Sequence, residues 1–82
     1  MRHDDFTIGC EFWCNKRRWR CTDIGRRVIV AIRLDEVEIG GGGPGGTITY
    51  EEALAEGWFN GPPYAVTEIV FDEEAIEAST PV

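Results

Sequence analysis

The sequence predicts a mostly β domain, built as a small, bent antiparallel sheet or an SH3-like barrel with one short helix in a loop. Three observations support this. Residues 6–14 and 18–22 alternate apolar and polar side chains with the period of a β-strand. The run RVIVAIRL at 27–34 is apolar and β-branched. Tight-turn residues separate these segments, and 82 residues suffice for a single domain, 1–82.

The first strand is expected over residues 6–14, with one parity of its side chains turned toward the core. The inward residues would be Phe6, Ile8, Cys10, Phe12 and Cys14. A two-residue turn at Asn15-Lys16 would connect it to the second strand, and a four-residue loop would keep the same faces, so the loop length stays open. The two-residue turn sets Trp13 opposite Arg18, Phe12 opposite Trp19, Glu11 opposite Arg20 and Cys10 opposite Cys21.

This register is chemically coherent on both faces. Phe12 meets Trp19 on the inward face, while Glu11 pairs with Arg20 and Arg18 lies over the Trp13 ring on the other. The segment TDIGRR is a second turn, and the strand 27–34 follows. Its inward residues are expected to be Val28, Val30, Ile32 and Leu34, so that Ile29 and Ala31 need a second cover.

The second half of the chain holds the expected helix. Thr49 and Glu52 match a capping box, and Gly57 is the expected stop. The helix would pack through Tyr50, Ala53, Leu54 and Trp58. Before it, residues 40–46 are expected to form a flexible Gly-rich loop.

The last strand is expected at 64–71, after a rigid turn at FNGPPY. Asp72 would then cap a short helical turn. Residues 1–5 and 79–82 are expected to be loose termini.

Charge is distributed unevenly along the chain. Residues 1–34 hold all 8 basic residues and 4 acidic ones, a net +4, whereas residues 35–82 hold 11 acidic and no basic residues, which gives −7 overall. A field of that sign opposes non-specific binding to DNA or anionic membranes. The N-terminal segment MRHDDFTIG has no apolar signal-peptide core, and three cysteines without one favour a cytoplasmic protein with reduced thiols.

The segments WRCTDIG, NGPPYAV and VFDE, spaced as here, resemble a small family of proteobacterial proteins with no assigned activity. The resemblance covers Phe6 to about Ile76, except for the Gly-rich segment and the helix, which look like an insertion. It implies a compact β domain and residence on a mobile element. It carries over no catalytic residue.

Zinc binding is the first chemistry that the residues suggest, through His3, Cys10, Cys14 and Cys21. In an extended strand Cys10 and Cys14 lie roughly 13 Å apart, too far for two ligands with Zn–S bonds of about 2.3 Å. A Cys10–Cys21 disulfide is geometrically possible but unfavoured in a reducing cytoplasm. Because the only His, Ser and Lys cannot form a nucleophile–base pair, we expect no enzyme and no cofactor or metal.

Two binding functions remain, beside the alternative that the acidic surface only keeps the protein in solution. The first is a module that docks on a basic protein partner through an acidic surface, as an inhibitor or nucleic-acid decoy of the anti-CRISPR-like, mobile-element type. Its residues would be Glu36, Glu38, Glu51, Glu52, Glu56, Asp72, Glu73 and Glu74. The alternative is a nucleic-acid-binding hairpin that uses the Arg/Trp stretch 16–27. Its residues would be Trp13, Lys16, Arg17, Arg18, Arg26 and Arg27.

Overall fold

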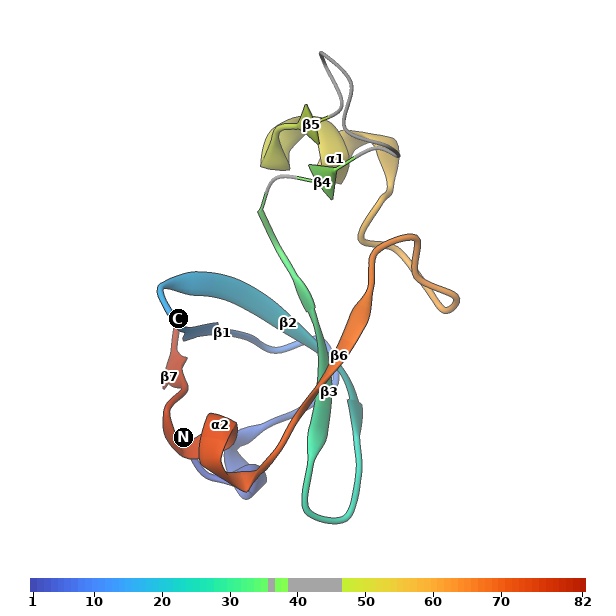
Figure 1. The fold of residues 1–82 in the computed structure, drawn as a ribbon. Helices are drawn as coiled ribbons and strands as arrows, with labels where there is room; N and C mark the ends of the chain where they lie inside the picture. The colour runs from blue at the N-terminus through green and yellow to red at the C-terminus, as the bar shows by residue number, and fades with distance from the viewer. Residues whose placement is uncertain (36, 39–46) are drawn as a thin grey trace.

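A computed structural model describes residues 1–35, 37–38 and 47–82. The chain forms five strands of one antiparallel sheet in the order β6-β3-β2-β1-β7. These strands are β1 (Glu11–Cys14), β2 (Arg17–Ile24), β3 (Ile29–Arg33), β6 (Glu68–Phe71) and β7 (Thr80–Pro81). The sheet is bent and open, with β6 and β7 as its edges (Figure 1). The expected bent antiparallel sheet is therefore confirmed, in the open form rather than as a closed barrel.

The β1–β2 hairpin has the register that the sequence predicts. Phe12 pairs with Trp19, Trp13 with Arg18 and Glu11 with Arg20. Its turn is the two-residue form, because Asn15 and Lys16 both have positive φ, of 53° and 64°. That combination is the type I′ geometry, whose twist matches that of the flanking strands.

The first strand is shorter than the expected 6–14, because a turn and a bulge precede it. The Cys10 N–H donates to the carbonyl of Thr7, and Gly9 has a φ of 94°. The Gly9 N–H donates to the Cys21 carbonyl, and the Cys21 N–H donates to the Cys10 carbonyl, so two residues oppose one. This is the G1 bulge, which requires glycine at its first position. As a result, Ile8 is 66% exposed and its expected inward orientation is wrong.

Gly9→Ala should lower the free energy of unfolding by about 1 to 2 kcal/mol. A Cβ built on Gly9 meets no atom within 4 Å, so the cost is that of placing a side chain at positive φ and includes no clash. A urea titration measures it. A neutral substitution would show that the bulge rearranges without cost.

Strand β3 has buried side chains on both faces of the sheet. Ile29 and Ala31 lie in the main core, which Phe6, Phe12, Cys14, Trp19, Cys21, Phe71 and Ile76 complete. Ile32 and Leu34 lie in a second core with Ala53 and Phe59. The expected inward parity is therefore wrong for the first half of the strand, where Val28 and Val30 are only half-buried. Because apolar and polar side chains do not alternate in this run, both of its faces can be buried. Each face is covered by a different part of the chain.

The α1 lobe, defined as residues 47–66, covers the second core. It contains β5 (Thr47–Ile48), which pairs with β4 (Val37–Glu38), and α1 (Tyr50–Glu56). The Thr49 hydroxyl oxygen accepts the Glu52 N–H at 3.2 Å, and Gly57 ends the helix at a φ of 81°, both as expected. Ala53 is fully buried, whereas Leu54 is 47% exposed, so Leu54 does not join the packed stripe.

The strand expected at 64–71, β6, begins at Glu68, and it is followed by a further strand, β7. Tyr64 and Val66 precede it and pack against the second core. Asp72 caps α2 (Glu73–Glu77) as expected, with its carboxylate accepting the Ala75 N–H at 2.9 Å.

The two segments expected to be loose termini make contacts in the structure. Strand β7 pairs with β1, and the Ser79 hydroxyl is buried and donates to the Ala75 carbonyl at 2.8 Å. His3 lies in a short 3-10 helix (His3–Asp5), and its Nε2 is 2.8 Å from the Gly25 carbonyl oxygen. The Gly-rich loop expected at 40–46 lies outside the described residues.

Candidate docking surfaces

The α1 lobe carries an acidic surface with no base near it in sequence. Glu51, Glu52 and Glu56 are exposed on α1, and no Lys or Arg occurs anywhere in residues 35–82. Within the described part of the chain, none of the ion pairs involves these three carboxylates. Glu51 and Glu52 also lie in the first turn of the helix, where negative charge is favourable. The Glu52 carboxylate also accepts the Thr49 hydroxyl at 3.2 Å, and all three glutamates remain exposed.

The other acidic residues expected on the same surface lie elsewhere. Figure 1 shows α1 at one end of the molecule and α2 at the other, and the longest dimension is 40 Å. Asp72, Glu73 and Glu74 stand at the start of α2, where Asp72 caps the helix and Glu73 is 3.7 Å from Arg27. Glu38 belongs to β4, and Glu36 lies outside the described residues. The expected single surface is therefore two clusters, of which the α1 cluster has the freer charges.

The hairpin arginines form ion pairs across the outer face of the sheet. Arg18 donates to Glu11 at 2.6 Å, and Arg20 lies 3.5 Å from the other oxygen of the same carboxylate. The Arg18 guanidinium also lies 5.9 Å from the centroid of the Trp13 ring, which is 41% exposed. The sequence predicts the Glu11–Arg20 and Arg18–Trp13 pairs, and the structure adds the shorter Glu11–Arg18 bond.

Asp35, two residues after the end of β3, also pairs with two arginines. Its two carboxylate oxygens accept from Arg17 at 2.8 Å and from Arg33 at 2.6 Å. Three of the six residues proposed for nucleic-acid contact, Arg17, Arg18 and Arg27, are thus engaged by acids. Lys16 and Arg26 are exposed, and no described carboxylate forms an ion pair with them. The hairpin therefore offers less free positive charge than its composition indicates.

The three cysteines are free thiols that belong to the main core or its border. Cys10 and Cys21 are joined by a backbone hydrogen bond of 2.8 Å, in agreement with the expected pairing. Burial raises the pKa of Cys21 from 9.0 to about 11, and the neighbouring Cys10 contributes to the shift. Within the described ranges, no group of three or more His, Cys, Asp and Glu side chains is arranged to hold a metal ion.

The Cys21 thiol predicts a loss of stability at alkaline pH. Because its pKa is about 11 in the folded chain and 9.0 without burial, the unfolded chain loses this proton first as the pH rises. Ionisation then favours unfolding, and about 2 to 3 kcal/mol should be lost by pH 11. The stability difference between wild type and Cys21→Ala, measured by urea titration, should shrink over this interval. A constant difference from about pH 8 to 11 would contradict the assignment.

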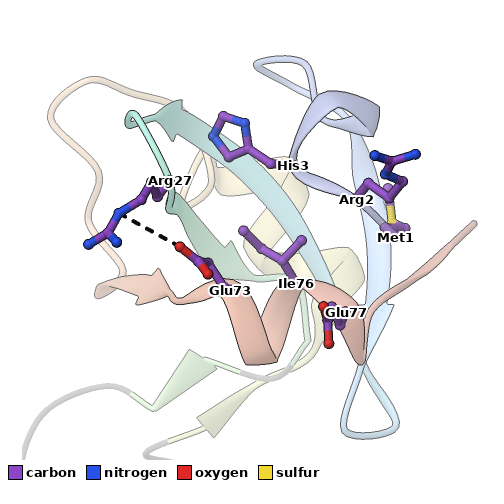
Figure 2. A pocket seen from close by; sticks show the side chains of 7 residues that line it. All are labelled: Met1, Arg2, His3, Arg27, Glu73, Ile76 and Glu77. Carbon is purple, nitrogen blue, oxygen red and sulfur yellow. Dashed lines mark ion pairs between the residues drawn. The ribbon is translucent and has the colours of Figure 1, made fainter.

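A shallow pocket of about 210 Å³ lies where the N-terminal segment meets α2 (Figure 2). It is lined by Met1, Arg2, His3, Arg27, Glu73, Ile76 and Glu77. The side chains come from three segments far apart in sequence, so no local pattern could have indicated it. The described lining residues include an imidazole and two carboxylates but no hydroxyl, thiol or lysine.

Comparisons with known proteins found no matching family model, no matching curated protein and no matching solved structure. The resemblance to a proteobacterial family therefore stays a prediction from the quoted segments. In the part of the chain that the structure describes, no helix is both long and apolar enough to cross a membrane.

Proposed function

We propose that this protein is a non-enzymatic binding module of the cytoplasm that docks on a basic protein partner through the acidic α1 lobe. In this role it acts as an inhibitor or as a decoy for nucleic acid, as expected for a small protein of a mobile element. The observation that carries the proposal is the set of three exposed carboxylates, Glu51, Glu52 and Glu56, on a lobe without any base.

Two features of the lobe support docking there. The helix is held to the sheet by the buried Ala53 and Phe59, so its charges have a fixed position. Leu54 is exposed beside them and provides apolar area that a partner can bury. Negative charge on a fixed surface speeds encounter with a positive partner and rejects negative ones.

The alternative nucleic-acid-binding hairpin is supported by the exposed Trp13 together with Lys16 and Arg26. Against it, Arg17 is paired with Asp35 and Arg18 with Glu11, so their charge is partly offset, although Arg33 and Arg20 share the same two carboxylates. The overall charge of −7 adds long-range repulsion from phosphates.

Binding of two labelled probes at low salt separates the two functions. The first probe is poly-lysine, which represents a basic protein surface, and the second is a single-stranded oligonucleotide. We expect the wild-type protein to bind poly-lysine and to leave the oligonucleotide free. Oligonucleotide binding that Arg17→Ala and Arg18→Ala abolish, without poly-lysine binding, would move the function to the hairpin.

A further inference from the structure

Strand β6 is an exposed edge of the sheet with apolar side chains on both faces. Among the described strands, it pairs with β3 alone, on one side. Ile69 is 43% exposed and Val70 is 63% exposed, and Glu68 before them is exposed as well. The opposite edge, β7, has two residues and includes Pro81, which cannot donate to another strand. An exposed apolar edge of this kind is a template for the addition of another strand.

The hydrogen bonds of β3 show which backbone groups of β6 face outward. The Val30 carbonyl oxygen lies 3.3 Å from the Thr22 side-chain hydroxyl of β2, and the Leu34 N–H donates to the Arg18 carbonyl, so these two residues turn their backbone toward β2. Because backbone direction alternates along a strand, Ile29 and Ala31 turn toward β6. Their partners there are Phe71 and Ile69. The N–H and C=O groups of Glu68 and Val70 therefore point away from β3, to the open edge.

We propose that the β6 edge binds an extended segment of the protein partner, which adds as a sixth strand. This inference rests on the proposed function and specifies the partner's chemistry. The main-chain groups of Glu68 and Val70 would supply hydrogen bonds, and the exposed Ile69 and Val70 side chains would contact alternate apolar residues of the segment.

The charges at both ends of β6 indicate which residues should flank the apolar part of the bound segment. Figure 1 shows β6 running between the α1 lobe and α2. Glu68 stands at its start, beyond which lies the α1 cluster, and Asp72, Glu73 and Glu74 follow its end. A segment with lysine or arginine at both ends of a short apolar run complements this pattern. A second copy of this chain does not, because its own β6 brings the same acids and a charge of −7.

The test uses a labelled peptide of alternating valine and threonine with two lysines at each end. Val70→Pro removes the outward N–H and leaves the hydrogen bonds between β3 and β6 in place, since proline is tolerated on an edge. Val70→Thr keeps that N–H and serves as the matched control. We expect Val70→Pro to weaken peptide binding about tenfold or more, and clearly more than Val70→Thr, which alters only the apolar contact of the side chain. Equal binding by the two variants would overturn edge pairing.

A second measurement covers the case in which Val70→Pro fails to fold. Adding the peptide to the wild-type protein should slow amide hydrogen exchange at Glu68 and Val70, and unchanged exchange at both would overturn the proposal.

Two further measurements test which molecule occupies the β6 edge. Equal binding of a peptide with glutamates in place of the lysines would contradict a basic partner, and with it the proposed function, while edge pairing stands. A wild-type dimer in sedimentation that Val70→Pro dissociates would make a second copy the occupant and overturn the proposed one.

Discussion

Trp19→Ala should lower the free energy of unfolding by about 3 to 5 kcal/mol, the range for truncating a buried aromatic side chain. Trp19 is 8% exposed, its ring centroid is 4.8 Å from that of Phe71, and its indole N–H donates to the Cys14 carbonyl at 3.1 Å. The substitution removes these ring contacts and the hydrogen bond from the indole N–H. Since small domains have a stability of only about 5 to 15 kcal/mol, much of the stability should be lost.

Trp13→Ala is the matched control on the neighbouring strand. Its ring is 41% exposed and contacts the Arg18 guanidinium on the outer face, so its loss should cost about 1 kcal/mol or less. Urea titrations of the two variants measure the difference. Equal losses would mean that the two faces of the hairpin are reversed.

Phe59→Ala should cost about 3 to 4 kcal/mol and should act mainly on the α1 lobe. Phe59 is almost fully buried against Ile32, Leu34 and Ala53, and its ring stacks on Tyr50 at 5.8 Å. None of these residues belongs to the main core. Loss of Phe59 should therefore release the lobe before the sheet unfolds.

Amide hydrogen exchange distinguishes local release from global unfolding. In Phe59→Ala, the amides of α1 should exchange much faster, while those of the β1–β2 hairpin stay protected. A uniform increase across α1, β1 and β2 would show that the two cores unfold as one unit.

The hairpin could be predicted from the sequence because the residues that determine its register lie close together in the chain. A strict period of two fixes which side chains share a face, and Asn15-Lys16 leaves few ways to reverse the chain. The caps at Thr49 and Asp72 are local in the same sense, because each carboxylate or hydroxyl lies three residues before the N–H that it accepts.

Apart from the bulge at Gly9, the remaining errors arise where one segment depends on a distant one. The uninterrupted apolar run of β3 does not reveal which face is inward, and in the structure both are covered. The bulge had a local signal, since glycine within a strand pattern often marks one, and Gly9 has that position. The division of the acids between α1 and α2 had none, because it depends on how the two helices are placed in the whole fold.

The most direct test of docking through the α1 lobe compares two triple variants that remove the same charge from opposite ends. One variant replaces Glu51, Glu52 and Glu56 with Gln, and the other replaces Glu73, Glu74 and Glu77. Stopped-flow association with poly-lysine is measured at low and at physiological ionic strength. The account predicts that the α1 variant associates several-fold more slowly at low salt and that the α2 variant, whose acids flank only one end of the β6 edge, slows association less. Equal slowing by both variants, or slowing by the α2 variant alone, would contradict docking through the α1 lobe.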